Sequence, residues 1–85
     1  IAENNTNEIS YYRIQIAASN KLLELKPYNF NGLKAVDVVK EGKIYKYLYG
    51  KHKTLEGANK SLKTARASGF NSSFVVRFQN NEIIK

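Results

Sequence analysis

Hydrophobic and polar residues alternate in several short stretches of the chain, as is typical of strands that bury one face. Residues 11–19 read YYRIQIAAS, so Ile14 and Ile16 point to one side while Arg13 and Gln15 point to the other. The pattern recurs in SSFVVRFQ at residues 72–79, where three residues alternate with two others: Phe74, Val76 and Phe78 with Val75 and Arg77. Both stretches are predicted strands.

Residues 35–50, AVDVVKEGKIYKYLYG, predict a β-hairpin because two alternating runs flank a glycine that can supply the positive φ of a tight turn. We centre the turn on Glu41 and Gly42. That register places three pairs of residues opposite each other: Val36 and Tyr47, Val38 and Tyr45, and Asp37 and Lys46.

The second strand of this hairpin carries a tyrosine at every other position. The tyrosines share one face and the intervening residues share the other: Tyr45, Tyr47 and Tyr49 against Ile44, Lys46 and Leu48. Tyrosines on the open face would form a ladder for a stacked ligand and would bury Lys46. Because lysine is almost never buried without a partner, we expect the tyrosines to face the core. Each phenol hydroxyl left unpaired there would cost about 1–3 kcal/mol.

Two helices are predicted between the strands. Ser19 and Asn20 can cap a short helix over KLLELK, residues 21–26, which Pro27 ends after barely two turns. In the irregular stretch that follows, Tyr28 and Phe30 are either lids over the core or exposed contact residues, and we favour the lids.

The second predicted helix starts at a Thr54 cap, runs to about Ser68 and is stopped by Gly69, with Phe70 as the usual hydrophobic partner. Four apolar residues form its buried stripe: Leu55, Ala58, Leu62 and Ala65. We expect its basic residues to form a solvated face: Lys60, Lys63 and Arg66.

The order of these elements predicts an α+β domain with a ferredoxin-like, or RNP-like, βαββαβ arrangement. In that fold a four-stranded antiparallel sheet carries both helices on one face and leaves the other face open to a ligand. We interpret residues 1–9 as the end of a linker, residues 10–80 as the domain and residues 81–85 as a C-terminal tail.

Composition favours a binding module over an enzyme. The chain has 85 residues, no cysteine and one histidine, His52, so neither a thiolate zinc site nor a multi-histidine metal site is available. Its isolated glycines form no phosphate-binding loop, and its scattered acids suggest no carboxylate pair. We therefore predict no catalytic residue, no metal and no cofactor, and we interpret His52 as a turn or packing residue.

The formal charge of +7 favours an anionic partner, whether nucleic acid, an anionic membrane surface or an acidic glycan. No apolar run approaches the roughly 20 residues of a membrane span. RNA or another single-stranded nucleic acid is the alternative partner, because a basic four-stranded sheet with exposed aromatic residues is how an RRM stacks bases. GKIYKYLYG, however, lacks the second small residue of the RNP1 pattern.

The stretches YRIQIAAS and KIYKYLYGKHKTLEGANKSLKTARASGFNSSFVV together resemble the sporulation-related repeat (SPOR) domain. The PYNFNGLK segment further resembles the version found at the C-terminal end of N-acetylmuramoyl-L-alanine amidases of Bacteroidota. The resemblance covers residues 11–78. It departs from the family in the helix shortened by Pro27 and in Lys51 and His52, which replace a proline and an aromatic residue.

The resemblance implies a non-catalytic envelope domain that binds peptidoglycan glycan strands lacking stem peptides and targets a parent protein, such as a cell-wall amidase, to the periplasmic division septum. The family's site implies Gln15, Ser19 and outward residues of the third and fourth strands. Chemically, Gln15 suits an acetamide and cationic side chains suit the lactyl carboxylate that peptide removal frees. The predicted glycan-binding residues are Arg13, Gln15, Ser19, Ile44, Lys46, Leu48 and Arg77.

Overall fold

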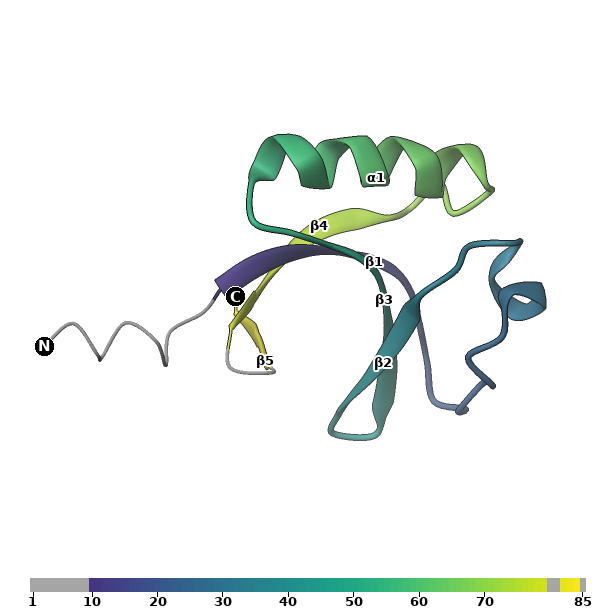
Figure 1. Cartoon of the computed structure of the whole chain (residues 1–85). Helices are drawn as coiled ribbons and strands as arrows, with labels where there is room; N and C mark the ends of the chain where they lie inside the picture. The colour runs from purple at the N-terminus through teal and green to yellow at the C-terminus, as the bar shows by residue number, and fades with distance from the viewer. Residues whose placement is uncertain (1–9, 80–81, 85) are drawn as a thin grey trace, which may run out of the picture.

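The computed structural model describes residues 10–79 and 82–84, which form a curled, half-barrel sheet of five antiparallel strands with a single α-helix (Figure 1). The predicted linker at residues 1–9 lies outside the described residues. From one edge to the other, the sheet consists of β2 (Val36–Glu41), β3 (Ile44–His52), β1 (Ser10–Ser19), β4 (Phe74–Gln79) and β5 (Glu82–Ile84). The helix α1 (Leu55–Ala67) lies over β1, β3 and β4.

The predicted βαββαβ fold with a four-stranded sheet is wrong in two places. The first predicted helix, over residues 21–26, is absent, and a single 3₁₀ turn, η2 (Pro27–Phe30), follows that segment instead. A run of six residues stopped by proline is too short to be stable as a helix. The second error is at the other end of the chain, where residues 82–84 of the predicted tail form β5 against β4.

Two β-bulges lie where β1 pairs with β3. Ile16 is the extra residue between the pairs Gln15–Leu48 and Ala17–Tyr47. Nearer the start of β1, Gly50 and Lys51 of β3 oppose Arg13 alone, and Gly50 adopts a φ of 76° that favours glycine. A bulge bends its strand and increases the local twist. Two of them on the central strand pair account for the curl of the sheet.

The main core lies between the sheet, α1 and the η2 segment. Its buried residues come from all three: Ile14, Ile16, Phe30, Leu33, Val36, Tyr47, Ala58 and Ala65. On α1 the small Ala58 and Ala65 are fully buried, so the helix backbone comes close to the sheet. Leu55 was predicted to belong to the buried stripe, but it is 51% exposed. Phe30 covers the core as predicted, but Tyr28 is 71% exposed.

The tyrosines of β3 face this core, as predicted: Tyr47 is fully buried, and Tyr45 and Tyr49 pack against the same cluster. The hydroxyl of Tyr47 is satisfied by the segment that was predicted as a helix. It accepts a hydrogen bond from the Leu23 amide at 2.8 Å and donates one to the Lys21 carbonyl at 3.0 Å. The polar end of a core residue thus holds this non-helical segment against the sheet.

The hairpin turn lies one residue later than predicted, at Gly42 and Lys43, because Glu41 pairs with Ile44. All predicted cross-strand pairs therefore shift by two, so that Val38 lies opposite Tyr47 and Asp37 opposite Leu48. A shift of two preserves the face of every side chain, whereas a shift of one would reverse it. For that reason the orientation of the tyrosines is correct although the register is not.

The helix α1 has the predicted caps. The Thr54 hydroxyl accepts a hydrogen bond from the Gly57 amide at 3.1 Å. At the other end, the Gly69 amide donates to the Arg66 carbonyl and the Phe70 amide to the Ala65 carbonyl, which is the Schellman arrangement, with Gly69 at a φ of 111°. Phe70 then packs against the core.

Candidate functional site

The sheet face away from α1 is only partly open. Leu48, Val76 and Phe78 form a second, smaller hydrophobic cluster there, and Tyr11, Val39 and Ile83 pack against it. Leu48 is one of the predicted glycan-binding residues. It is fully buried in this cluster, so a ligand cannot contact it. Two grooves border this cluster, one lined by Val76 and the other by Phe78.

The first groove, which we call the sheet groove, has a volume of about 400 Å³. It brings together three of the residues predicted to bind glycan: Gln15, Lys46 and Arg77. Phe74 pairs with Gln15 across β4 and β1 and is 48% exposed, so its ring offers an apolar surface beside the amide. The groove is completed by Val75, Val76, Ile83 and Ile84.

The two cationic residues that line the sheet groove, Lys46 and Arg77, differ in their partners and in their position on the sheet. Lys46 forms an ion pair with Glu41, and its side chain is 18% exposed. Arg77 is exposed and lies opposite Tyr12, which packs against the core beside α1, so its side chain leaves β4 on the α1 face and not on the face of Gln15. An anionic ligand in the groove would therefore meet Lys46, which it would have to share with the Glu41 carboxylate.

Two other predicted contact residues do not line the sheet groove. Ser19 ends β1 opposite Tyr45, and its hydroxyl accepts a hydrogen bond from the Lys21 amide at 3.0 Å. Ile44 is 39% exposed next to the hairpin turn. Ser19 pairs with Tyr45, which packs against the core beside α1, so the bulge at Ile16 turns Ser19 to the α1 face, away from Gln15. Ile44 could contact a ligand only if the ligand extended beyond the groove along β3.

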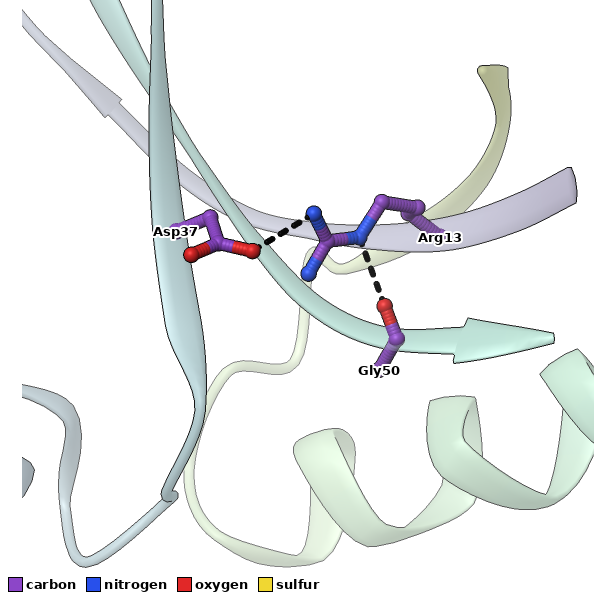
Figure 2. A network of polar contacts seen from close by, with 3 residues as sticks. All are labelled: Arg13, Asp37 and Gly50. Atoms are coloured by element: carbon purple, nitrogen blue, oxygen red, sulfur yellow. Dashed lines mark hydrogen bonds and ion pairs between the residues drawn. The ribbon is translucent and has the colours of Figure 1, made fainter. Parts of the chain in front are cut away.

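Arg13, the remaining predicted contact residue, lines a second groove, which we call the arginine groove. Its side chain is 7% exposed; Nη1 donates to Asp37 Oδ2 at 2.8 Å and Nε donates to the Gly50 carbonyl at 2.6 Å (Figure 2). One side chain of β1 thereby joins β2 and the bulge of β3. The groove has a volume of about 470 Å³, and its lining consists of Tyr11, Arg13, Leu25, Asp37, Val38, Val39, Lys51 and Phe78.

Phe74, Tyr11, Asp37 and Lys51 were not among the predicted site residues. Alternation from Gln15 and Arg13 could have placed Tyr11 on the same face of β1. The contribution of Asp37 and Lys51 could not be anticipated in the same way, because it depends on the shifted hairpin register and on the Gly50 bulge.

His52 is a packing residue at the end of β3, consistent with its interpretation from sequence. Its Nε2 lies 2.6 Å from the Ser61 hydroxyl of α1, and a Cβ added at Gly57 would approach its Nδ1 to 3.0 Å. A serine–histidine pair can act as nucleophile and base when a third group orients the histidine. Within the described residues no carboxylate hydrogen-bonds to the ring, and Ser61 lines neither of the two grooves.

Among residues 10–79 and 82–84, no group of three or more histidine, cysteine, aspartate or glutamate side chains is arranged to hold a metal ion. The single α-helix of this part of the chain is also too short and too polar to cross a membrane. Comparison of the chain with protein-family models, with curated proteins and with solved structures gives no match.

Proposed function

We propose that this domain is a non-catalytic module that binds glycan strands of peptidoglycan lacking stem peptides, and that the strand lies along the sheet groove. The observation that carries the proposal is the grouping of an amide, a cationic side chain and one exposed aromatic ring in a single groove: Gln15, Lys46 and Phe74. The SPOR-like stretches of the sequence support the same ligand and an envelope location near the division septum.

Each of these groups matches one feature of a stripped glycan. The Gln15 amide can both donate to and accept from the acetamide of an N-acetylated sugar. The Phe74 ring can pack against the apolar face of a sugar ring. Removal of the peptide converts the lactyl amide of muramic acid into a free carboxylate, which the Lys46 ammonium can attract as a point charge. A strand that retains its peptides offers no such carboxylate and is bulkier.

The nucleic-acid alternative finds less support in this geometry. An RRM-like platform stacks two or three bases on aromatic side chains of the open sheet face. Here the tyrosines of β3 face α1, and of the aromatic residues that the structure describes, Tyr28 and Phe74 are the strongly exposed ones. Only Phe74 belongs to the sheet, so a stacked run of bases would have a single strongly exposed ring on it.

Co-sedimentation of the domain with peptidoglycan sacculi tests the proposal. We expect binding that increases when an amidase has removed the stem peptides. Phe74→Ala and Gln15→Ala should each weaken this binding, while Leu55→Ala, an exposed apolar residue on α1, serves as the matched control. Binding that is absent, or equal with and without amidase treatment, would refute the proposal. A salt-dependent complex with labelled single-stranded RNA would then favour the alternative.

A further inference from the structure

The arginine groove carries a buried charge whose hydrogen-bonding capacity is not used up. Arg13 Nη1 and Nε have partners, whereas Nη2 forms no hydrogen bond with any residue that the structure describes (Figure 2). Nη2 is not sealed from solvent either, since Ser73 Oγ is the buried side-chain polar atom without a partner in the described part of the chain. A guanidinium presents planar donors suited to a carboxylate.

The wall beside Arg13 consists of two neighbouring aromatic rings, tilted 41° to each other, with a cation beyond each. The Arg13 guanidinium lies 6.0 Å from the Phe78 ring centre, the Phe78 and Tyr11 ring centres are 5.4 Å apart, and Lys51 Nζ lies 4.5 Å from the Tyr11 ring centre. Leu25 and Val39 add apolar surface to the lining, beside the charged Asp37. A ligand in this groove would thus have positive charge at both ends of an apolar surface.

The sum of the charges defines the ligand further. Arg13 and Lys51 contribute two positive charges and Asp37 one negative charge, so the groove has a net charge of one positive unit. That charge is neutralised by a monoanion. The volume of about 470 Å³ lies within the range of small-molecule clefts.

We propose that the arginine groove is a second binding site, which takes a carboxylate attached to a compact apolar group, with the carboxylate at Arg13 Nη2 and the apolar group against Phe78 and Tyr11. Lys51, at the far end of this wall, adds positive charge that attracts the anion. The carboxyl terminus of a peptide and a simple organic acid share this chemistry. The proposal does not rest on glycan binding, because the sheet groove is lined by different residues, and failure of the sacculus experiment would leave it unaffected.

The test is a titration of the ¹⁵N-labelled domain with N-acetyl-L-leucine, followed by amide chemical shifts. We expect shifts at Tyr11 and Lys51 that saturate, and none of comparable size at Gln15 or Phe74. N-acetyl-L-leucinamide, which lacks the carboxylate, should bind at least tenfold more weakly. Equal responses to the acid and the amide, or shifts confined to the sheet groove, would overturn the proposal.

Variants sharpen the test without depending on Arg13, whose removal could unfold the sheet. Asp37→Asn keeps an acceptor for Arg13 but removes the competing negative charge, so it should tighten binding about three- to tenfold. Lys51→Gln should weaken it by a similar factor, and Lys34→Gln, an exposed lysine outside the groove, should not change it. A gain from Asp37→Asn cannot arise from misfolding. If the variant is folded, as its amide spectrum will show, and binds no more tightly, the assignment is contradicted.

The source of the ligand is addressed by a third probe, 4-methylpentanoate, which has the carboxylate and the apolar group but no amide. Affinity equal to that of N-acetyl-L-leucine indicates a simple organic acid as the ligand. Markedly weaker binding indicates a peptide carboxyl terminus, whose amide contributes contacts of its own. Either result supports a carboxylate site, whereas failure of both acids to bind overturns it.

Discussion

Tyr47→Phe is expected to destabilise the domain although it removes a single oxygen atom. Tyr47 is fully buried, and its hydroxyl joins the Leu23 amide at 2.8 Å and the Lys21 carbonyl at 3.0 Å. At a net value of about 0.5–1.5 kcal/mol for each hydrogen bond, the two together contribute about 1–3 kcal/mol. Because residues 21 and 23 are exposed, water can replace part of this loss, which gives about 1–2 kcal/mol. For a domain of this size that lowers Tm by roughly 4–16 °C.

Urea unfolding followed by far-UV circular dichroism measures this loss, with Tyr45→Phe as the matched control. Tyr45 packs against the same core, but its hydroxyl makes no hydrogen bond in the described part of the chain, and Lys40 can remain over a phenylalanine ring. Hydrogen exchange adds a local readout, because the Leu23 amide should lose its protection in Tyr47→Phe alone. If both variants are equally stable and Leu23 exchanges unchanged, the proposed anchoring of this segment is wrong.

Three further predictions concern single positions. Gly50→Ala should cost about 1–3 kcal/mol in urea unfolding, because φ is 76° and the new Cβ would lie 3.2 Å from both Ser61 Oγ and His52 Nε2; unchanged stability would argue against the bulge. Thr54→Ala should cost about 1 kcal/mol through loss of the cap on α1, whereas Thr54→Ser should cost little. The hydrogen bond that Tyr28 donates to Glu24 raises the pKa of Tyr28 above 10.0, so any stability it adds is present below pH 10.0 and is lost as pH rises through the raised pKa. Glu24→Gln should lower that pKa in an ultraviolet absorbance titration, and an unchanged pKa would exclude Glu24 as the cause.

The elements predicted correctly are those whose signals are local in the sequence. Thr54 and Gly69 define the ends of α1 through hydrogen bonds to backbone groups a few residues away. The tyrosine face of β3 follows from alternation and from the cost of burying Lys46. Both inferences survive errors in tertiary arrangement, and the hairpin shows this directly, since its faces are right and its register is shifted.

The segment after β1 could not be predicted because its structure depends on a distant residue. Three leucines at residues 22–25 suggest an amphipathic helix, yet all three are strongly exposed: Leu22, Leu23 and Leu25. The core beside the sheet is instead filled by Phe30 and Leu33, and the backbone at residues 21 and 23 is held by Tyr47. Propensity over six residues is too weak to compete with such tertiary contacts.

The candidate site was predicted in part because alternation assigns faces but says nothing of curvature. Gln15 and Lys46 do lie in one groove, while Leu48, on the same face, is covered by the second hydrophobic cluster. The difference arises at the bulges on either side of the Gln15–Leu48 pair. By bending the central strands they enclose Leu48 between Val76 and Phe78, and because Val76 lines the sheet groove and Phe78 the arginine groove, this cluster separates the two sites. The Gly50→Ala variant thus tests the curl as well as the bulge, since flattening the sheet should expose Leu48 and perturb both grooves together.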